Sequence, residues 1–188
     1  FDNLYVESNF IDYILNNNFN LEKLIIISPD EGGMKRAVRV SNKLGVGMGT
    51  IYKERSEVNV VNTMSLMGNV ENKICIIVDD MIDTGGTACK ASKLLKDKGA
   101  EKIYMFVCHG IFSGKALENI KNSEFDKVIV TNTLDQTRHI EKIKELGIED
   151  RMDIIDVSWM CAEAIRGCNY GESLKELYDN PKKINLYK

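Results

Sequence analysis

Three aspartates, two glycines and two threonines lie within nine residues directly after an aliphatic run, in the stretch ICIIVDDMIDTGGT at 74–87. Adjacent glycines let the backbone bend tightly and expose several N–H groups, and a helix that starts there adds its dipole. With the threonine hydroxyls, these N–H groups form an anion site sized for a phosphate monoester. The predicted phosphate-binding residues are Thr84, Gly85, Gly86 and Thr87.

Asp79 and Asp80, which end the aliphatic run, cannot bind that phosphate directly because like charges repel at close range. Carboxylates accept hydrogen bonds from the vicinal hydroxyls of a sugar, and they bind hard cations such as Mg²⁺. A phosphate at one end and a diol at the other describe a ribose 5-phosphate. Two other interpretations stay open. The acids could merely end a strand while Asp83 caps a helix, or the loop could belong to a nucleotide site, although the pattern G-x-x-x-x-G-K-[ST] is missing.

Two further stretches place charged residues at the ends of expected strands. In IYKER, a period of two puts Lys53 and Arg55 on one side of the strand, and two cations there suit a triphosphate. The alternative is a solvated charge cluster. In SPDEGG, Asp30 follows another strand and is expected at the same sheet edge as Asp79. The alternative there is a helix cap by Asp30, with the two glycines forming a turn.

The elements that must position these residues alternate between aliphatic runs and stretches of helical period, as in βαβ units. The expected strands are dense in apolar residues, as parallel strands buried on both faces require. They span 23–28, 48–53, 73–78, 102–108, 127–131 and 152–157, and residues 64–72 are expected to form half of a small edge hairpin. Helical stripes lie within 34–44, 88–98, 140–146 and 160–168. The predicted fold is α/β, a doubly wound, mostly parallel sheet flanked by helices.

The composition describes one ordinary globular domain spanning residues 1–188, with 44% apolar and 28% charged residues and a net charge of −3. No basic stripe favours nucleic acid or an anionic membrane as a partner. The aliphatic runs are far shorter than a membrane span, and we expect a cytoplasmic protein. The five cysteines form no Cys-x-x-Cys pair and are interpreted as reduced, small hydrophobic residues.

Several stretches together resemble the ribose-phosphate pyrophosphokinase (phosphoribosyl-pyrophosphate synthetase) family. VDDMIDTGGT is similar to the phosphoribosyl-pyrophosphate loop that this family shares with type I phosphoribosyltransferases. Other stretches single out the synthetases by their order and spacing: SPDEGGMKRA, KERSEVNVV, HGIFSGKAL, VTNTL and AEAI followed by GES. The resemblance covers nearly the whole chain and implies the type I phosphoribosyltransferase fold.

The resemblance implies transfer of a diphosphoryl group from ATP to the 1-hydroxyl of ribose 5-phosphate, which yields AMP and phosphoribosyl pyrophosphate. In that reaction Lys53 and Arg55 would stabilise charge on the transferred group. The resemblance also implies that Asp83, Thr84, Gly85, Gly86 and Thr87 hold the 5-phosphate. Asp79 and Asp80 would hold the 2- and 3-hydroxyls with Mg²⁺ nearby, and Asp30 resembles an acid near the metal and sugar. The family also implies a homo-oligomer, a hexamer built from dimers.

The start of the chain resembles the family's mid-chain linker, so we expect the C-terminal half of a synthetase. The N-terminal half would then carry a metal-binding histidine and most ATP contacts, and the chain alone would catalyse little. Two other functions remain open. One is a phosphoribosyltransferase acting on a base, which accounts for residues 79–87 but does not require KER or HGIFSG. The other is a non-catalytic, synthetase-associated regulatory subunit.

Overall fold

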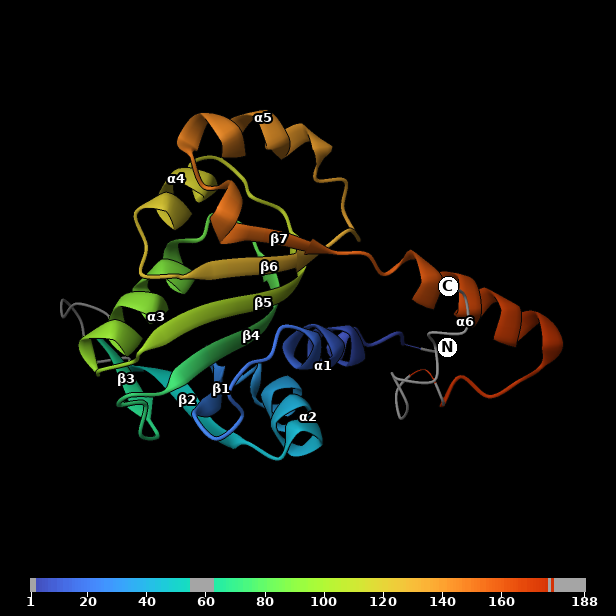
Figure 1. The fold of residues 1–188 in the computed structure, drawn as a ribbon, viewed down its shortest axis with the longest axis horizontal. Helices are drawn as coiled ribbons and strands as arrows, with labels where there is room; N and C mark the ends of the chain where they lie inside the picture. Colours follow the sequence, from blue (N-terminus) through green and yellow to red (C-terminus); the bar gives the residue numbers. More distant parts are fainter. Residues whose placement is uncertain (1–2, 55–62, 176, 178–188) are drawn as a thin grey trace.

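The computed structural model describes residues 3–54, 63–175 and 177 (Figure 1). Within them, seven strands form one sheet in the order β3-β2-β1-β4-β5-β6-β7, and only the β2–β3 pair is antiparallel. The strands are β1 (Leu24–Ser28), β2 (Gly47–Glu54), β3 (Thr63–Met67), β4 (Ile74–Ile82), β5 (Lys102–Gly110), β6 (Lys127–Thr131) and β7 (Met152–Ile155). The helices are α1 (Glu7–Asn16), α2 (Met34–Leu44), α3 (Gly86–Asp97), α4 (Ala116–Lys121), α5 (Thr137–Leu146), the 3-10 helix η1 (Glu149–Arg151) and α6 (Ser158–Tyr170).

The central strands are buried on both faces, and their alternating side chains build two separate cores. Ile25 and Ile27 of β1 face one core, which α3, α4 and α5 cover. Leu24 and Ile26 face the other, which is covered by α1, α2 and the start of α6. Figure 1 shows the two groups of helices on opposite sides of the sheet. This arrangement confirms the predicted doubly wound α/β fold with helices on both faces.

Most predicted strands are confirmed, but several boundaries differ. β4 and β5 run on to Ile82 and Gly110, because they continue to pair with each other past the expected ends. β7 ends at Ile155, two residues early, whereas β3 is the predicted antiparallel edge strand beside β2. α3 begins at Gly86 instead of near Ala88. The sequence patterns did not indicate α1 or α4.

The strand order changes direction at β1, since the chain moves from β1 to β2 on one side and then crosses to β4 on the other. Ser28 at the end of β1 pairs with Thr50 of β2, and β2 continues to Glu54. On the other side β1 pairs with β4 as far as Ile77, and β4 continues to Ile82. Both neighbours therefore extend past β1. This switch point is where open α/β sheets bind ligands.

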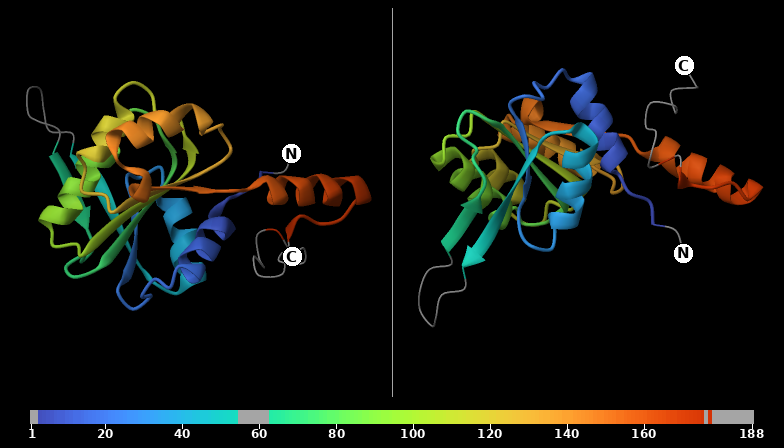
Figure 2. Two further views of the ribbon diagram at one scale, coloured as in Figure 1. Left: turned by 45° about the horizontal axis from the view of Figure 1, so that its top comes forward. Right: turned by 90° about the horizontal axis from the view of Figure 1, so that it is seen from below.

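α6 leaves the sheet after β7 and extends away from the body of the structure (Figure 2). In the described residues, no helix has both the length and the apolar character required to cross a bilayer.

Candidate functional site

The two adjacent aspartates lie on the part of β4 that extends past β1. Strand β4 supplies them because pairing with β5 holds its backbone extended as far as Ile82. The Arg36 guanidinium, from the first turn of α2, contacts both carboxylates: Nη1 lies 3.1 Å from Asp79 Oδ1 and Nη2 lies 3.5 Å from Asp80 Oδ2. The Asp80 backbone N–H also donates to Asp79 Oδ1, at 2.8 Å. The pair is thus held by one cation that the sequence did not single out.

The two carboxyl groups differ in their affinity for a proton. Burial raises the pKa of Asp79 to about 6, and the neighbouring Asp80 carboxylate adds to this rise, while the Asp80 N–H and Arg36 oppose it. Burial also works against ionisation of Asp80, but the hydrogen bond from the Asp79 carboxyl and the charge of Arg36 outweigh it and hold the pKa of Asp80 below its ordinary value. Asp80 is therefore the better charged acceptor at neutral pH, and Asp79 takes up a proton near pH 6.

The glycine-rich loop ends in the first turn of α3, and its geometry suits an anion. Gly85 has φ +73°, a left-handed conformation that favours glycine, and helix α3 begins at the next residue. The first bond of this helix runs from the Cys89 N–H to the Gly85 carbonyl, at 2.9 Å. The N–H groups of Gly86, Thr87 and Ala88 precede that bond, so they have no carbonyl acceptor within the helix. Such N–H groups at a helix N-terminus are suited to an anion, and the phosphate-binding role of this loop stays a prediction.

The loop is fixed from outside by the segment after β5 and by α4. The Asn119 side chain donates to the Thr84 carbonyl at 2.9 Å, and the Ser113 N–H donates to the Asp83 carbonyl at 3.2 Å. The Ile111 N–H donates to the Ile82 carbonyl at 2.9 Å. The stretch HGIFSG, to which we assigned no role from the sequence, thus supports the glycine-rich loop with its backbone N–H groups. Asn119 carried no signal, because its partner is distant in sequence.

Asp30 occupies the loop that follows β1. Its Oδ1 accepts the Gly33 N–H at 2.9 Å, just before the first residue of α2. The cap position of this helix is Gly33, so Asp30 fixes the turn before α2 and does not itself occupy the cap position, whereas the turn expected at the two glycines is present. Ser28 Oγ donates to the Asp30 carbonyl at 2.7 Å and closes the turn. A side chain at Gly33 would meet Ser28 Oγ at 2.9 Å and displace the hydroxyl that closes the turn, so the turn favours glycine. The Asp30 side chain remains exposed beside the switch point.

The structure describes only one of the two predicted cations. Lys53 lies in β2, one residue before its end, where its backbone is paired with Met64 of β3. Because β1 and β2 are parallel, the end of β2 and the Asp30 loop share one sheet edge. Arg55 lies outside the described residues, and its predicted role is retained as a prediction.

The acid pair fits a magnesium ion that is shared with a ligand. Mg²⁺ commonly binds through one or two carboxylates and takes its other oxygens from water and substrate phosphates. In the described part of the chain, no three His, Cys, Asp or Glu side chains come together as a metal cluster. Asp79 and Asp80 offer two carboxylates, so substrate or water oxygens would have to complete the coordination.

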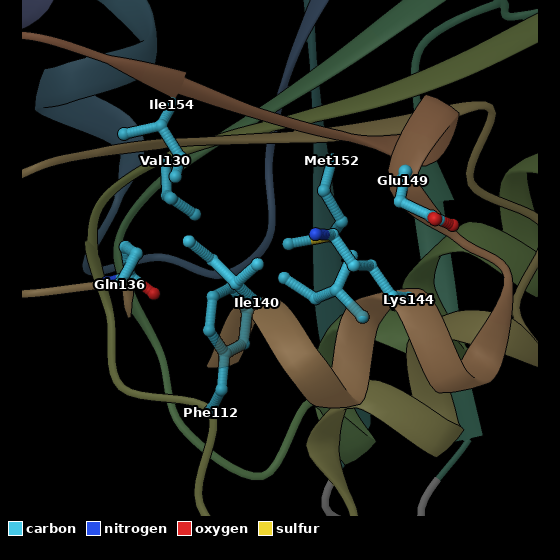
Figure 3. Close-up of a pocket in the computed structure, with 9 residues that line it drawn as sticks. Phe112, Val130, Gln136, Ile140, Lys144, Glu149, Met152 and Ile154 are labelled. Atoms are coloured by element: carbon cyan, nitrogen blue, oxygen red, sulfur yellow. The ribbon is translucent and has the colours of Figure 1, made fainter. Parts of the chain in front are cut away.

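An apolar cavity of about 150 Å³ lies elsewhere, between α5 and the β6–β7 side of the sheet (Figure 3). Val130, Met152 and Ile154 line it from the sheet, and Ile140 from α5. The Gln136 amide at its wall donates to the Gly110 and Leu134 carbonyls. Its lining includes none of the predicted site residues and offers little to bind a phosphate, so we place the site at the strand ends.

Known proteins resemble this chain in sequence and in structure. Residues 57–179 match the model of the phosphoribosyl synthetase-associated domain. Ribose-phosphate pyrophosphokinase 3 of Saccharomyces cerevisiae is 44% identical over 179 residues, which are 95% of this chain and 54% of that protein. Ribose-phosphate pyrophosphokinase 2 of Schizosaccharomyces pombe is 43% identical over 178 residues, 94% of this chain and 54% of that protein. The chain therefore spans about half the length of these relatives.

Among solved structures, the phosphoribosylpyrophosphate synthetase of Mycobacterium smegmatis matches with a TM-score of 0.76 and 29% identity, over 90% of this chain and 52% of that one. An adenine phosphoribosyltransferase matches with a TM-score of 0.50 and 18% identity, over 61% of this chain and 72% of that one, which bears on the fold alone. The fold is that of the type I phosphoribosyltransferases. The chain belongs to the phosphoribosyl synthetase-associated domain family.

Proposed function

We propose that this chain binds ribose 5-phosphate as part of a ribose-phosphate diphosphokinase, which converts ATP and ribose 5-phosphate into AMP and phosphoribosyl pyrophosphate. One observation carries the proposal: a helix N-terminus that follows a left-handed glycine and an acidic pair lie on a single strand–loop–helix unit, β4 to α3, at the switch point of the sheet. The resemblance to ribose-phosphate pyrophosphokinases supports it.

In this proposal the N–H groups that follow Gly85 hold the 5-phosphate, with the hydroxyls of Thr84 and Thr87 beside them. Asp79 and Asp80 accept hydrogen bonds from the 2- and 3-hydroxyls of the sugar. Binding the 5-phosphate at one end and the 2- and 3-hydroxyls at the other fixes the 1-hydroxyl in one orientation. This removes much of the entropic cost of the reaction.

The reaction itself is a displacement at the β-phosphorus of ATP. The 1-oxygen of the ribose forms a bond to the β-phosphorus, the bond from that phosphorus to the oxygen it shares with the α-phosphate breaks, and the hydroxyl proton is lost. Lys53 and Arg55 would stabilise the negative charge on the diphosphoryl group as it transfers. Mg²⁺, when bound, would neutralise phosphate charge; Asp30, Asp79 and Asp80 are its proposed protein neighbours.

Other parts of the proposal concern the whole protein. The relatives are about twice as long as the matched region, so we propose that most ATP contacts come from a part of the protein outside this chain. Assembly into a homo-oligomer, with a cytoplasmic location, also belongs to the proposal.

Ligand-dependent unfolding tests the binding step on this chain. Ribose 5-phosphate at 100 times its dissociation constant should raise the free energy of unfolding by about 2.7 kcal/mol. Ribose and inorganic phosphate, each alone at the same concentration, should stabilise the chain much less, because each reaches only one end of the site. If all three compounds give the same shift, or none gives any with or without Mg²⁺, the proposed site is wrong.

A further inference from the structure

The Arg36 guanidinium lies between the two carboxylates that are proposed to bind the sugar diol. Its side chain is 22% exposed, against 24% for Asp79 and 54% for Asp80, so the contact with Asp79 is well shielded from water. The planar fork of arginine places Nη1 on one carboxylate and Nη2 on the other. We propose that Arg36 is a positioning residue that orients the Asp79–Asp80 pair for the 2- and 3-hydroxyls of ribose. The inference rests on the proposed function.

The start of α2 is built to hold this arginine in place. Asp30 fixes the turn before the helix, and the Arg36 N–H donates to the Gly33 carbonyl at 3.0 Å. The next residue, Ala37, is fully buried in the core under the helix. Arg36 therefore extends from a rigid helix start, across the end of β1, to the extended part of β4. The loop that carries Asp30 and the strand that carries the acid pair are joined by this one side chain.

Two neighbouring carboxylates repel each other, and without a cation between them the side chains would move apart. The Arg36 guanidinium contacts one oxygen atom of each carboxylate. The Asp80 N–H also donates to the Asp79 carboxylate. Of the other two oxygen atoms, Asp80 Oδ1 accepts the Met81 N–H at 2.9 Å and can accept a further donor. Both atoms are then set in fixed directions for a ligand. A hydroxyl missing from the sugar would leave one of these charged acceptors without its donor, so the pair should discriminate ribose 5-phosphate from 2-deoxyribose 5-phosphate.

A purely structural ion pair would predict something different. Losing Arg36 would then lower the stability of the protein and weaken the binding of both sugar phosphates by the same factor. A positioning role predicts that the ratio of the two dissociation constants changes. The test is to measure both dissociation constants, by calorimetry without a divalent cation, in the native protein that carries this chain and in its variants. Thermal unfolding and circular dichroism check that each variant is folded.

The expected ratio in the wild type is about 10-fold or more in favour of ribose 5-phosphate, since hydrogen bonds to charged groups are strong. Arg36→Gln should reduce that ratio by at least about threefold, as expected for groups in direct contact. Arg36→Lys keeps the charge but not the fork, and should also reduce the ratio, though less. Lys43→Gln is the matched control. It removes one charge from the same helix seven residues further on, about 10 Å along the axis, and should leave the ratio within about twofold.

An unchanged ratio in a folded Arg36→Gln variant, together with equal weakening for both sugars, would overturn the positioning role while leaving the proposed function intact. A wild-type protein that binds both sugar phosphates with equal affinity would show instead that the acid pair does not bind the 2- and 3-hydroxyls. In that case the proposed binding mode is wrong, and the role of Arg36 is overturned with it.

Discussion

Replacing Gly85 with alanine would strain the phosphate loop without adding a clash. Gly85 has φ +73°, a left-handed conformation that costs a residue with a side chain about 1–2 kcal/mol of conformational free energy. A Cβ built there lies 3.6 Å from the Ala116 carbonyl oxygen, an ordinary contact, so the cost is in the backbone alone. For a chain of this size, that loss lowers the unfolding midpoint by about 2–4 °C per kcal/mol.

The loop can relieve this strain by shifting, and a shift moves the N–H groups of Gly86 and Thr87 away from the phosphate. A hydrogen bond to a charged group contributes about 1.5–3 kcal/mol, so losing one should weaken ribose 5-phosphate binding by roughly 10- to 150-fold. Gly147→Ala is the matched control, because Gly147 has φ +64° at the end of α5 and no atom within 4 Å of a built Cβ. It should lose similar stability and keep its affinity.

Titration calorimetry with ribose 5-phosphate, beside thermal unfolding of both variants, measures the two effects separately. Affinity that survives in a destabilised Gly85→Ala protein would refute the assignment of this loop to the phosphate. Equal loss of affinity in both glycine variants would show that general destabilisation, and not the loop, controls binding.

Three further predictions follow from the same site. Lys53→Ala should lower turnover of the complete enzyme far more than it weakens ribose 5-phosphate binding, in steady-state kinetics and calorimetry; equal losses would contradict the proposed role. Asn119→Ala removes the bond to the Thr84 carbonyl, at a cost of about 1 kcal/mol, and should weaken ribose 5-phosphate binding several-fold, whereas Asn122→Ala at the end of the same helix should not. Because the pKa of Asp79 is raised on folding to about 6, its contribution to stability is present at low pH and is lost as pH rises from about 4 to 6. In EDTA, the unfolding midpoint of the wild type should therefore fall relative to that of Asp79→Asn as pH rises across that range. Midpoints that change in parallel with pH would contradict the raised pKa of Asp79.

The sheet was largely predictable because its strands carry their own signal. The first four residues of β1 are aliphatic, the first five of β4 are aliphatic except for Cys75, and both stretches are buried throughout. The continuation of β4 through Asp79 and Asp80 was not predictable from such a run, since acidic residues interrupt it and only pairing with β5 keeps it extended. The tight turn at Gly85 before α3 was predictable from the two adjacent glycines, since their conformational freedom is a local property.

The elements that the sequence patterns missed depend on tertiary contacts. α1 buries polar residues in its first turn, including Glu7 and Asn9, which obscures its apolar face. α4 has six residues, too few to show a helical period. Arg36 was one of several cations within a helical stretch, and nothing local distinguishes it. Its importance appears only when α2 packs beside β1 and directs the side chain onto β4.

Product analysis of the native protein tests the central claim most directly. The protein that carries this chain, incubated with ATP, ribose 5-phosphate, Mg²⁺ and inorganic phosphate, should form AMP and phosphoribosyl pyrophosphate in equal amounts, as followed by ³¹P NMR. Absence of AMP under these conditions would contradict the account, as would consumption of phosphoribosyl pyrophosphate with a free base and no requirement for ATP.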